Sequence, residues 1–366
     1  MNYFMPTRLF TGTDCIAAHR DALQALGERC LIVTGGAAAT ASGALADVEG
    51  ALTACGVEAT VWDGVTENPP LTSCIEAGRL AAETHSDFVL GIGGGSSLDA
   101  AKAIAVFATN PGLDEAGFYG LAWSNGPLPI ALVGTTAGTG SEVTKVSVLT
   151  DSAHRKHSIH DDRLYAAVAF GDSRHTRTCP EAVTLSCGVD VLAHATESYF
   201  SHKADEVSRA FAVRAVRLAI GPLDIVSKGG DLDDVQREQL YEASILGGLA
   251  INTTGTCFPH NVGYYLTESY GVSHGFASAA FMVPMLDFVH DFDPTYADGF
   301  FQAAGTTEQD YRTLVAQCLP ELGIRMSTAE VEAALPRWEN NGSVKNTRAN
   351  VSTEQIREIL HIMFVR

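Results

Sequence analysis

Basic residues are scarce in this sequence of 366 residues. Lysine and arginine number 24 against 43 aspartates and glutamates, which gives a formal net charge of −19 at pH 7. Such a charge repels phosphate backbones and anionic membrane surfaces. We therefore expect neither nucleic acid nor a membrane as a partner.

Long hydrophobic runs and paired cysteines are also missing. No run of the membrane-spanning length, about 18 residues, escapes a charge or a helix breaker, and the first residues lack a basic stretch followed by an apolar core. The eight cysteines are scattered singly, with no CxxC pair and no dense framework of the kind that small secreted domains need. These features predict a soluble, unsecreted, cytoplasmic protein with reduced and mostly buried cysteines.

Apolar residues make up 46% of the chain and alternate with polar segments in its first half. Strands are predicted where short apolar runs end in glycine or threonine, at residues 30–36, 59–65, 87–95, 130–136 and 165–172. Segments with helical periodicity lie between them. This alternation predicts an α/β domain over residues 1–178, with a parallel sheet that is covered on both faces and holds ligands at the carboxyl ends of its strands.

Strand signals nearly vanish after residue 178. Helical spacing is found at residues 207–223, 235–251, 276–292 and 313–324, and a capping box formed by Ser352 and Gln355 opens a last helix. The polar, asparagine-rich residues 335–351 are predicted to form an ordered surface connection. We expect a second, all-helical domain over residues 179–366.

A glycine loop (residues 93–97) follows the third predicted strand and leads directly into a helix-forming segment. Glycines let the backbone approach a ligand closely, and the free N–H groups and dipole of a helix start favour a phosphate. Because Ser96 stands at the third glycine position, the loop departs from the strict GxGxxG pattern. The loop predicts a pyrophosphate site, with a bare tight turn as the alternative.

A hydroxyl loop (residues 134–144) follows the next predicted strand. Its hydroxyl groups could bind phosphate or ribose, and they belong to Thr135, Thr136, Thr139 and Ser141. An ordinary turn between strands is the alternative. Two such loops in one sheet favour a dinucleotide ligand.

One carboxylate and three imidazoles in the second half have the chemistry of a metal site. Asp190 and His194 are four residues apart, which on a helix places both side chains on one face. His260 and His274 follow, separated by an expected helix break at Gly271. Such a set suits Zn²⁺ or Fe²⁺, although single histidines are more often surface or packed residues than ligands.

Four segments, in this order and at these separations, resemble the iron-containing (group III) alcohol dehydrogenases. They are GIGGGSSLDAAKAIA, TTAGTGSEVT, GVDVLAHATESY and HNVGYYLTESYGVSHG. The opening YFMPTRLFTGTD and the closing STEQIREIL match as well, so the resemblance covers nearly the whole chain. It implies a Rossmann-like dinucleotide-binding domain, a helical domain that bears the metal as in dehydroquinate synthase-like folds, and a cleft between them.

The resemblance also implies roles for individual residues. The implied metal ligands are Asp190, His194, His260 and His274. The implied cofactor-binding residues are Asn68, Gly94, Gly95, Ser96, Asp99, Thr135, Thr136, Thr139, Ser141, Lys156 and Leu185. A four-ligand set favours the alcohol dehydrogenase branch over the glycerol dehydrogenase and dehydroquinate synthase relatives, which use three ligands.

Two positions depart from the family pattern. Tyr264 stands where many members have a second histidine, which is assigned to proton transfer or to the substrate side of the cleft. Two interpretations of Tyr264 therefore remain: a catalytic residue that donates a hydrogen bond, or an aromatic side chain that only packs. Gly35 stands where NAD-preferring members place an aspartate that would repel a 2′-phosphate. NADP(H) is therefore admissible and slightly favoured over NAD(H), although residues 35–43 contain no arginine to bind the phosphate.

The sequence thus predicts reversible hydride transfer between NAD(P)(H) and a small primary alcohol or aldehyde, with Fe²⁺ as the first metal and Zn²⁺ as the second. The alternatives are a metal-dependent synthase or cyclase, or a glycerol dehydrogenase-like polyol dehydrogenase, on the same scaffold. A non-enzymatic nucleotide- or metal-binding protein is a third possibility. By resemblance, a homodimer is expected.

Overall fold

The computed structural model describes residues 3–365 and divides them into two compact units. The sheet unit comprises Phe4–Pro180 and the segment Asp233–Tyr241. The helical unit comprises Glu181–Leu232 and the residues from Glu242 onward, together with Tyr3. The sequence analysis placed residues 233–241 in the helical domain, because they lie at the start of a segment with helical periodicity. The structure groups them with the sheet unit.

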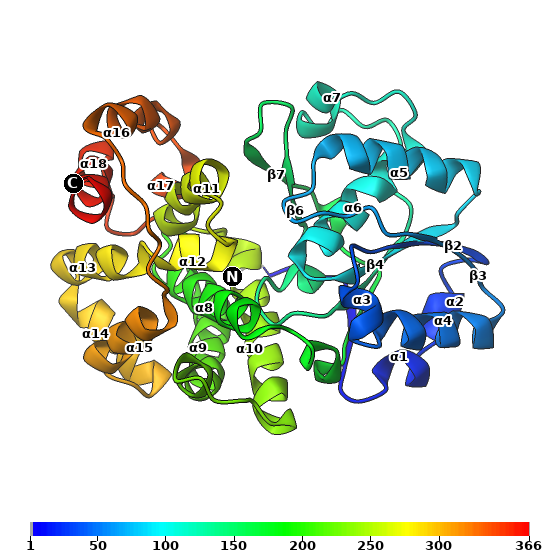
Figure 1. The fold of residues 1–366 in the computed structure, drawn as a ribbon, viewed down its shortest axis with the longest axis horizontal. Coiled ribbons are helices and arrows are strands. Elements are labelled where there is room, and N and C mark those ends of the chain that lie inside the picture. Colours follow the sequence, from blue (N-terminus) through cyan, green and yellow to red (C-terminus); the bar gives the residue numbers. More distant parts are fainter. Residues whose placement is uncertain (1–2, 366) are drawn as a thin grey trace. The chain divides into compact units, whose positions relative to one another are not determined.

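The sheet unit is built on six parallel strands in the spatial order β1-β8-β5-β4-β2-β3, which confirms the predicted parallel sheet (Figure 1). These strands are β1 (Arg8–Thr11), β2 (Arg29–Val33), β3 (Glu58–Trp62), β4 (Phe88–Gly93), β5 (Ile130–Gly134) and β8 (Val168–Gly171). A separate antiparallel hairpin pairs β6 (Val146–Thr150) with β7 (Lys156–His160). The helices of this unit are α1 (Cys15–Ala18), α2 (Asp21–Gln24), α3 (Ala38–Ala41), α4 (Ala44–Cys55), α5 (Leu71–Glu83), α6 (Gly95–Thr109) and α7 (Glu115–Tyr119). Short 3₁₀ turns are η1 (Ser141–Val143), η2 (Asp162–Leu164) and η3 (Ser173–Thr176).

Apolar clusters cover both faces of this sheet. In β2, Leu31 and Val33 belong to one cluster, whereas Cys30 and Ile32 belong to the other, as the alternation of side chains along a strand requires. Helices α5 and α6 supply the first cluster, and α1, α2 and α4 supply the second (Figure 1). Strands β4 and β5 are therefore buried along their whole length, which explains their continuously apolar sequence.

Two features of the sheet unit were not predicted from the sequence. Strand β1 has only four residues, and its first and last side chains are exposed, so it lacks an apolar run. In the hairpin, β6 alternates between buried and half-buried residues, and β7 has only one buried side chain. Both elements are too short or too polar to stand out by hydrophobic pattern alone.

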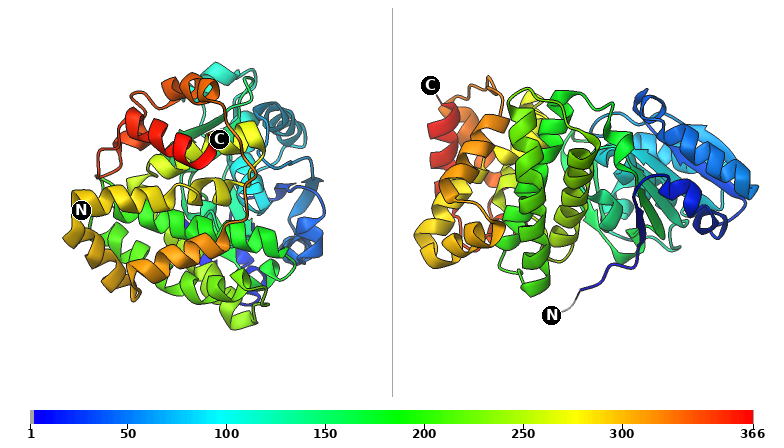
Figure 2. Two further views of the ribbon diagram at one scale, coloured as in Figure 1. Left: turned by 60° about the vertical axis from the view of Figure 1, so that its left-hand side comes forward. Right: turned by 90° about the horizontal axis from the view of Figure 1, so that it is seen from below.

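The described residues of the helical unit form helices and no strand, which confirms the predicted helical half. These are α8 (Glu181–Tyr199), α9 (Glu206–Ser227), α10 (Asp234–Thr254, whose first turns lie in the sheet unit), α11 (Phe258–Tyr270), α12 (His274–Ala279), α13 (Met282–Phe292), α14 (Pro294–Ala304), α15 (Glu308–Cys318), α16 (Thr328–Ala334), η4 (Leu335–Arg337), α17 (Gly342–Lys345) and α18 (Thr353–Phe364). The predicted capping box opens α18, which lies beside α16 (Figure 2).

Three helix boundaries differ from the periodicity. The segment 276–292 is divided between α12 and α13. Pro284 lies in the first turn of α13, and it lacks the N–H that would bond to the carbonyl of Ala280 and join the two helices. Helix α15 ends at Cys318, because the next residue, Leu319, precedes Pro320 and takes an extended backbone conformation. The connection 335–351 contains the short helices η4 and α17. Among the described residues, no helix has both the length and the apolar character needed to cross a membrane.

Candidate functional site

Helix α8 carries the first two predicted metal ligands on one buried face. Asp190 and His194 are four residues apart, and their side chains are 2% and 6% exposed. The Oδ2 atom of Asp190 lies 3.9 Å from Nε2 of His194. The second half of this helix is buried almost continuously, so the two polar side chains are placed inside the helical unit.

Helices α11 and α12 carry the other two predicted ligands. Helix α11 ends at Tyr270, where Gly271 takes a left-handed conformation with φ of 68°, and α12 then begins with His274 itself. The Nε2 atoms of His260 and His274 lie 3.3 Å and 3.8 Å from Oδ1 of Asp190. The expected break at Gly271 is therefore confirmed, and it turns the chain so that the second imidazole comes back to the first.

A close helix contact brings α12 against α8. A Cβ atom on Gly275 would lie 1.8 Å from the carbonyl oxygen of Ser186, a distance that no side chain can tolerate. Glycine at this position lets the backbones approach, and His274 is its immediate neighbour. The contact therefore sets how near His274 comes to Asp190.

The structure brings three of the four predicted ligands into one group. Candidate ligand atoms of Asp190, His260 and His274 all lie within 4.8 Å of one another. His194 lies beside this group but outside it: its Nε2 is 3.9 Å from Oδ2 of Asp190, and its ring packs on that of His260 with a centroid distance of 4.6 Å. The ring of His260 also packs against that of His274, with a centroid distance of 5.2 Å.

Two buried atoms of this group make no hydrogen bond. Oδ1 of Asp190 and Nε2 of His260 face each other, but without the geometry of a hydrogen bond. Buried polar atoms are nearly always satisfied in folded proteins, so such a pair needs a partner. A divalent cation bound by nitrogen and oxygen ligands supplies one, and the donor set suits Fe²⁺ or Zn²⁺.

The electrostatics of the cluster also favour a cation. Burial alone would raise the pKa of Asp190, but the neighbouring His194, His274 and His260 outweigh it and hold that pKa well below its usual range. Burial alone would lower the pKa of His260, but the carboxylates of Glu197 and Asp190 raise it to about 10. The buried carboxylates therefore stabilise positive charge at this point.

Glu197 is a candidate functional residue that the sequence analysis missed. Its fully buried carboxylate contacts Nδ1 of His260 and accepts a hydrogen bond from the backbone N–H of Cys257 at 2.6 Å. A carboxylate that binds one nitrogen of a histidine fixes the ring and leaves the other nitrogen for a metal. Its position seven residues after Asp190 places it on the same helix face, and this spacing is the signal that could have found it.

Tyr264 lies beside the cluster, one turn after His260 on α11. Its ring stacks on that of His274, with a centroid distance of 5.6 Å and an angle of 29° between the planes. The side chain is half-buried. Tyr264 therefore borders His274, the most exposed of the four candidate ligands.

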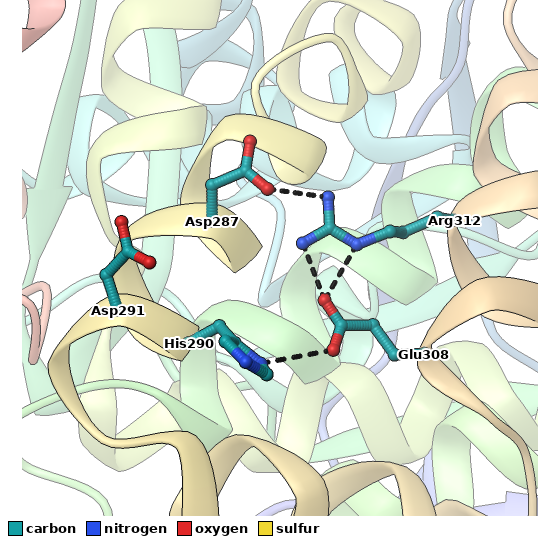
Figure 3. A pocket seen from close by; sticks show the side chains of 5 residues that line it. All are labelled: Asp287, His290, Asp291, Glu308 and Arg312. Carbon is teal, nitrogen blue, oxygen red and sulfur yellow. Dashed lines mark hydrogen bonds and ion pairs between the residues drawn. The ribbon is translucent and has the colours of Figure 1, made fainter.

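A second cluster of metal-binding residue types lies elsewhere in the helical unit, at His290, Asp298 and Glu308. Figure 3 shows the pocket beside it, lined by Asp287, His290, Asp291, Glu308 and Arg312. The guanidinium of Arg312 binds Glu308 at 2.6 Å and Asp287 at 2.8 Å, and His290 lies 3.2 Å from Glu308 (Figure 3). Arg312 thus already pairs with Glu308, one of the three residues of this cluster, which makes the cluster a weaker candidate for a metal site than the buried one around Asp190.

In the sheet unit, the two predicted loops meet at the carboxyl ends of neighbouring strands. Gly94 is the N-cap of α6, and the backbone N–H of Thr135 donates to the carbonyl of Gly93 at 2.9 Å. A Cβ atom on Gly95 would lie 2.7 Å from the methyl group of Thr139. The glycine loop and the hydroxyl loop are therefore in direct contact, as the order of the parallel strands requires.

Asn68 joins these loops from the connection after β3. Its backbone has a φ of 51°, in the left-handed region, and its N–H donates to Oγ of Ser96 at 3.4 Å. The hydroxyl of Thr150 donates to the carbonyl of Asn68 at 2.9 Å. These bonds hold the unusual backbone conformation and bring Asn68 against the glycine loop.

The remaining predicted cofactor residues differ in their surroundings. Gly35 follows β2, and a Cβ atom there would lie 2.2 Å from the carbonyl oxygen of Val65. Lys156 begins β7 in the sheet unit, whereas Leu185 lies in the first turns of α8 in the helical unit. Ser141 donates from its hydroxyl to the carboxylate of Asp99 at 2.6 Å, so these two predicted residues contact each other.

Comparison with known proteins identifies matches along nearly the whole chain. Residues 6–173 match the family model described as "Iron-containing alcohol dehydrogenase", and residues 184–362 match "Fe-containing alcohol dehydrogenase family, C-terminal". The chain is 33% identical over 286 residues to a 1,3-propanediol dehydrogenase from Citrobacter freundii, covering 77% of this chain and 73% of that protein.

Solved structures show the same similarity. An iron-containing alcohol dehydrogenase from Thermotoga maritima superposes with a TM-score of 0.90 and 30% identity, covering 99% of each chain. A sulfoacetaldehyde reductase from Bifidobacterium kashiwanohense, solved in complex with NAD⁺, superposes with a TM-score of 0.88 and 25% identity. That comparison covers 99% of this chain and 98% of the other.

Proposed function

Because this chain belongs to the iron-containing alcohol dehydrogenase family, we propose that it transfers a hydride reversibly between a nicotinamide cofactor and a small primary alcohol or aldehyde. Its activity is that of a metal-dependent alcohol dehydrogenase or aldehyde reductase. The observation that carries the proposal is the cluster of Asp190, His260 and His274, in which Oδ1 of Asp190 and Nε2 of His260 are buried without a hydrogen bond. The substrate class agrees with the names of relatives such as 1,3-propanediol dehydrogenase and lactaldehyde reductase.

The proposed metal ligands are Asp190, His194, His260 and His274, with Fe²⁺ as the first choice by family and Zn²⁺ as the second. When bound, the ion supplies Lewis acidity, which polarises a carbonyl for reduction and lowers the pKa of an alcohol for oxidation. Glu197 orients His260, since its carboxylate accepts a hydrogen bond from the Nδ1–H group and so directs Nε2 toward Asp190.

Tyr264 is proposed to act on the substrate side of the metal ligands. Its ring borders His274, and a phenol in that place can donate a hydrogen bond to a substrate oxygen. The half-buried apolar body of the ring also excludes water from this side of the cluster, whichever role its hydroxyl takes.

The cofactor is proposed to bind where the two loops of the sheet unit meet. The start of α6 offers backbone N–H groups and a helix dipole to the pyrophosphate. The residues proposed to form the cofactor-binding site, by contact or by support from behind, are Gly35, Asn68, Gly94, Gly95, Ser96, Asp99, Thr135, Thr136, Thr139, Ser141, Lys156 and Leu185. The sulfoacetaldehyde reductase was solved in complex with NAD⁺, which supports a nicotinamide dinucleotide as the cofactor.

Gly35 leads us to propose that NADP(H) is accepted and slightly favoured over NAD(H). An aspartate at this position would repel a 2′-phosphate, and the close approach of Val65 leaves no room for a side chain. By resemblance to the family, and from the scattered single cysteines, we further propose that the protein is a cytoplasmic homodimer.

Turnover by the metal-loaded protein tests the proposed function. We expect oxidation of NADH and NADPH that depends on short aldehydes, and the reverse reaction with the corresponding alcohols. Because residues 35–43 neither repel nor bind a 2′-phosphate through a charged side chain, the two cofactors should differ by no more than about tenfold in kcat/KM. Chelation should lower the rate by about 100-fold or more, and added Fe²⁺ should restore it.

The same assay separates the alternatives. If no aldehyde or alcohol supports turnover in the metal-loaded protein, the proposal is wrong and a nucleotide- or metal-binding protein is favoured. If a phosphorylated substrate is converted with no net change in the nicotinamide, the chain is a synthase or cyclase on this scaffold. A strong preference for polyols would indicate the glycerol dehydrogenase-like reaction.

A further inference from the structure

A fully buried lysine lies behind the proposed cofactor loops. Lys102 stands on α6, five residues after the glycine loop, and its side chain has no exposed surface. Its ammonium group donates to the carbonyl and the hydroxyl of Ser141, at 2.9 Å and 2.7 Å, and to the carbonyl of Val146 at 2.7 Å. All three of its protons are therefore used within the protein.

Asp99 completes this network from the preceding turn of α6. Its Oδ1 accepts from the hydroxyl of Ser141 at 2.6 Å, and its Oδ2 accepts from the backbone N–H of Val148 at 2.9 Å. Its carbonyl accepts from the hydroxyl of Ser147 at 2.8 Å. The carboxylate thus binds groups of the hydroxyl loop and of β6, and it lies 3.6 Å from the ammonium of Lys102.

The environment of the network is unfavourable for charge. Burial lowers the pKa of Lys102, and Asp99 and Glu142 only partly oppose this effect. Burial also raises the pKa of Glu142, the residue after Ser141, whose carboxylate accepts a hydrogen bond from Tyr241 at 2.8 Å. Well-packed apolar side chains are often more stable than buried ions, so this arrangement calls for a reason other than stability.

The geometry of the loops supplies such a reason. Ser141 is two residues from Thr139, and its backbone N–H donates to the hydroxyl of Thr139 at 3.3 Å. The methyl group of Thr139 in turn packs on Gly95, at the start of α6. A shift of Ser141 would therefore move the hydroxyl loop against the N–H groups that are proposed to bind the pyrophosphate.

We infer that Asp99, Lys102 and Ser141 are positioning residues that hold the glycine loop and the hydroxyl loop in register for the pyrophosphate of the cofactor. The inference rests on the proposed function, because it assumes that a dinucleotide binds at these loops. Because Lys102 is completely buried, it cannot contact the cofactor. Its role is therefore to hold the two loops in place. It also places Asp99 behind the cofactor, with its carboxylate committed to Ser141 and Val148.

Binding of the cofactor to Lys102→Met tests this inference without relying on turnover. Methionine fills a similar volume but donates no hydrogen bond, so the hydroxyl loop loses the bonds from Lys102 and is held to α6 by the Ser141–Asp99 bond alone. We expect the Kd for NADH and NADPH, measured by fluorescence titration of the metal-loaded protein, to rise by about tenfold, the size of one lost hydrogen bond. Metal content, and the aldehyde KM at saturating cofactor, should stay unchanged.

Asn110→Ala is the matched control, because Asn110 ends the same helix. Its buried amide donates to the carbonyls of Val106 and Asn125, far along α6 from the glycine loop. We expect this variant to lower the melting temperature but to change the Kd by less than about twofold. An equal rise of the Kd in both variants would show that general destabilisation of α6 is responsible, and would overturn the inference.

Variants of Ser141 keep the test decisive if Lys102→Met does not fold. Ser141→Ala removes the hydroxyl that links Lys102 to Asp99, whereas Ser141→Thr retains it. We expect Ser141→Ala to bind the cofactor more weakly than the wild type, and Ser141→Thr to bind it with an affinity near that of the wild type. A folded Lys102→Met or Ser141→Ala variant with wild-type affinity would overturn the inference alone, whereas a wild-type protein that binds neither NADH nor NADPH would overturn the proposed function with it.

Discussion

We expect His274→Ala to lose its metal and its activity together while it still binds the nicotinamide cofactor. The side chain of His274 is 27% exposed, against 2% for that of Asp190, so its truncation leaves the smallest buried gap among the four proposed ligands. With three ligands left, turnover should fall by about 10³-fold, equivalent to ~4 kcal/mol of transition-state stabilisation. Metal analysis, kcat/KM for an aldehyde and the Kd for NADH check the three parts of this expectation.

His290→Ala is the matched control for this prediction. His290 lies in the other cluster of metal-binding residue types in the helical unit, beside Glu308 and Arg312 (Figure 3). Its removal should leave the metal content and the rate near wild type. The ligand assignment is wrong if His274→Ala keeps full activity, or if His290→Ala is the variant that loses the metal.

Glu197→Ala should weaken metal binding although Glu197 is not a proposed ligand. Without the carboxylate, His260 loses the partner that fixes its ring, and the N–H of Cys257 loses its acceptor. Loss of such an outer partner typically lowers metal affinity by about 10- to 100-fold. Glu197→Gln keeps an oxygen that can accept from Nδ1, so its loss should be about tenfold or less. Competition with a chelator of known affinity measures both values.

Ser198→Ala separates this effect from a loss of stability. Ser198 is the next residue of α8, is fully buried, and donates to the carbonyl of Ala250 at 2.9 Å. Its removal should lower the melting temperature, as we also expect for the Glu197 variants, but leave the metal affinity unchanged. Equal metal affinities in Glu197→Ala and the wild type would show that His260 needs no support from Glu197.

The parts of the fold that follow from local patterns could be predicted. The buried strands β4 and β5 have continuous apolar runs, and the glycines after them mark where ligand loops begin. The pair Asp190 and His194 follows from helical spacing. His260 and His274 were added as imidazoles on either side of the expected break at Gly271, and the family resemblance then implied all four as ligands of one metal. Functional residues that follow one another at the short, regular spacing of a helix or strand can thus be predicted from a single sequence.

Residues that depend on contacts between distant segments could not be predicted. Lys102 meets Ser141 and Val146 only because α6 packs against the hydroxyl loop and β6. Glu197 is one of many acidic residues, and only the packing of α11 on α8 shows that it faces His260. The close approach at Gly275 likewise has no local signature, since a glycine in a helix reveals nothing about the backbone opposite it.

Anomalous X-ray diffraction from crystals of the iron-loaded protein, recorded on both sides of the iron absorption edge, tests the central claim most directly. The claim predicts one strong peak within about 2.0–2.2 Å of the ligand atoms of Asp190, His194, His260 and His274, the distances found for nitrogen and oxygen ligands of such ions. A peak at His290, Asp298 and Glu308 instead, or an active enzyme with no metal among the four residues, would contradict it.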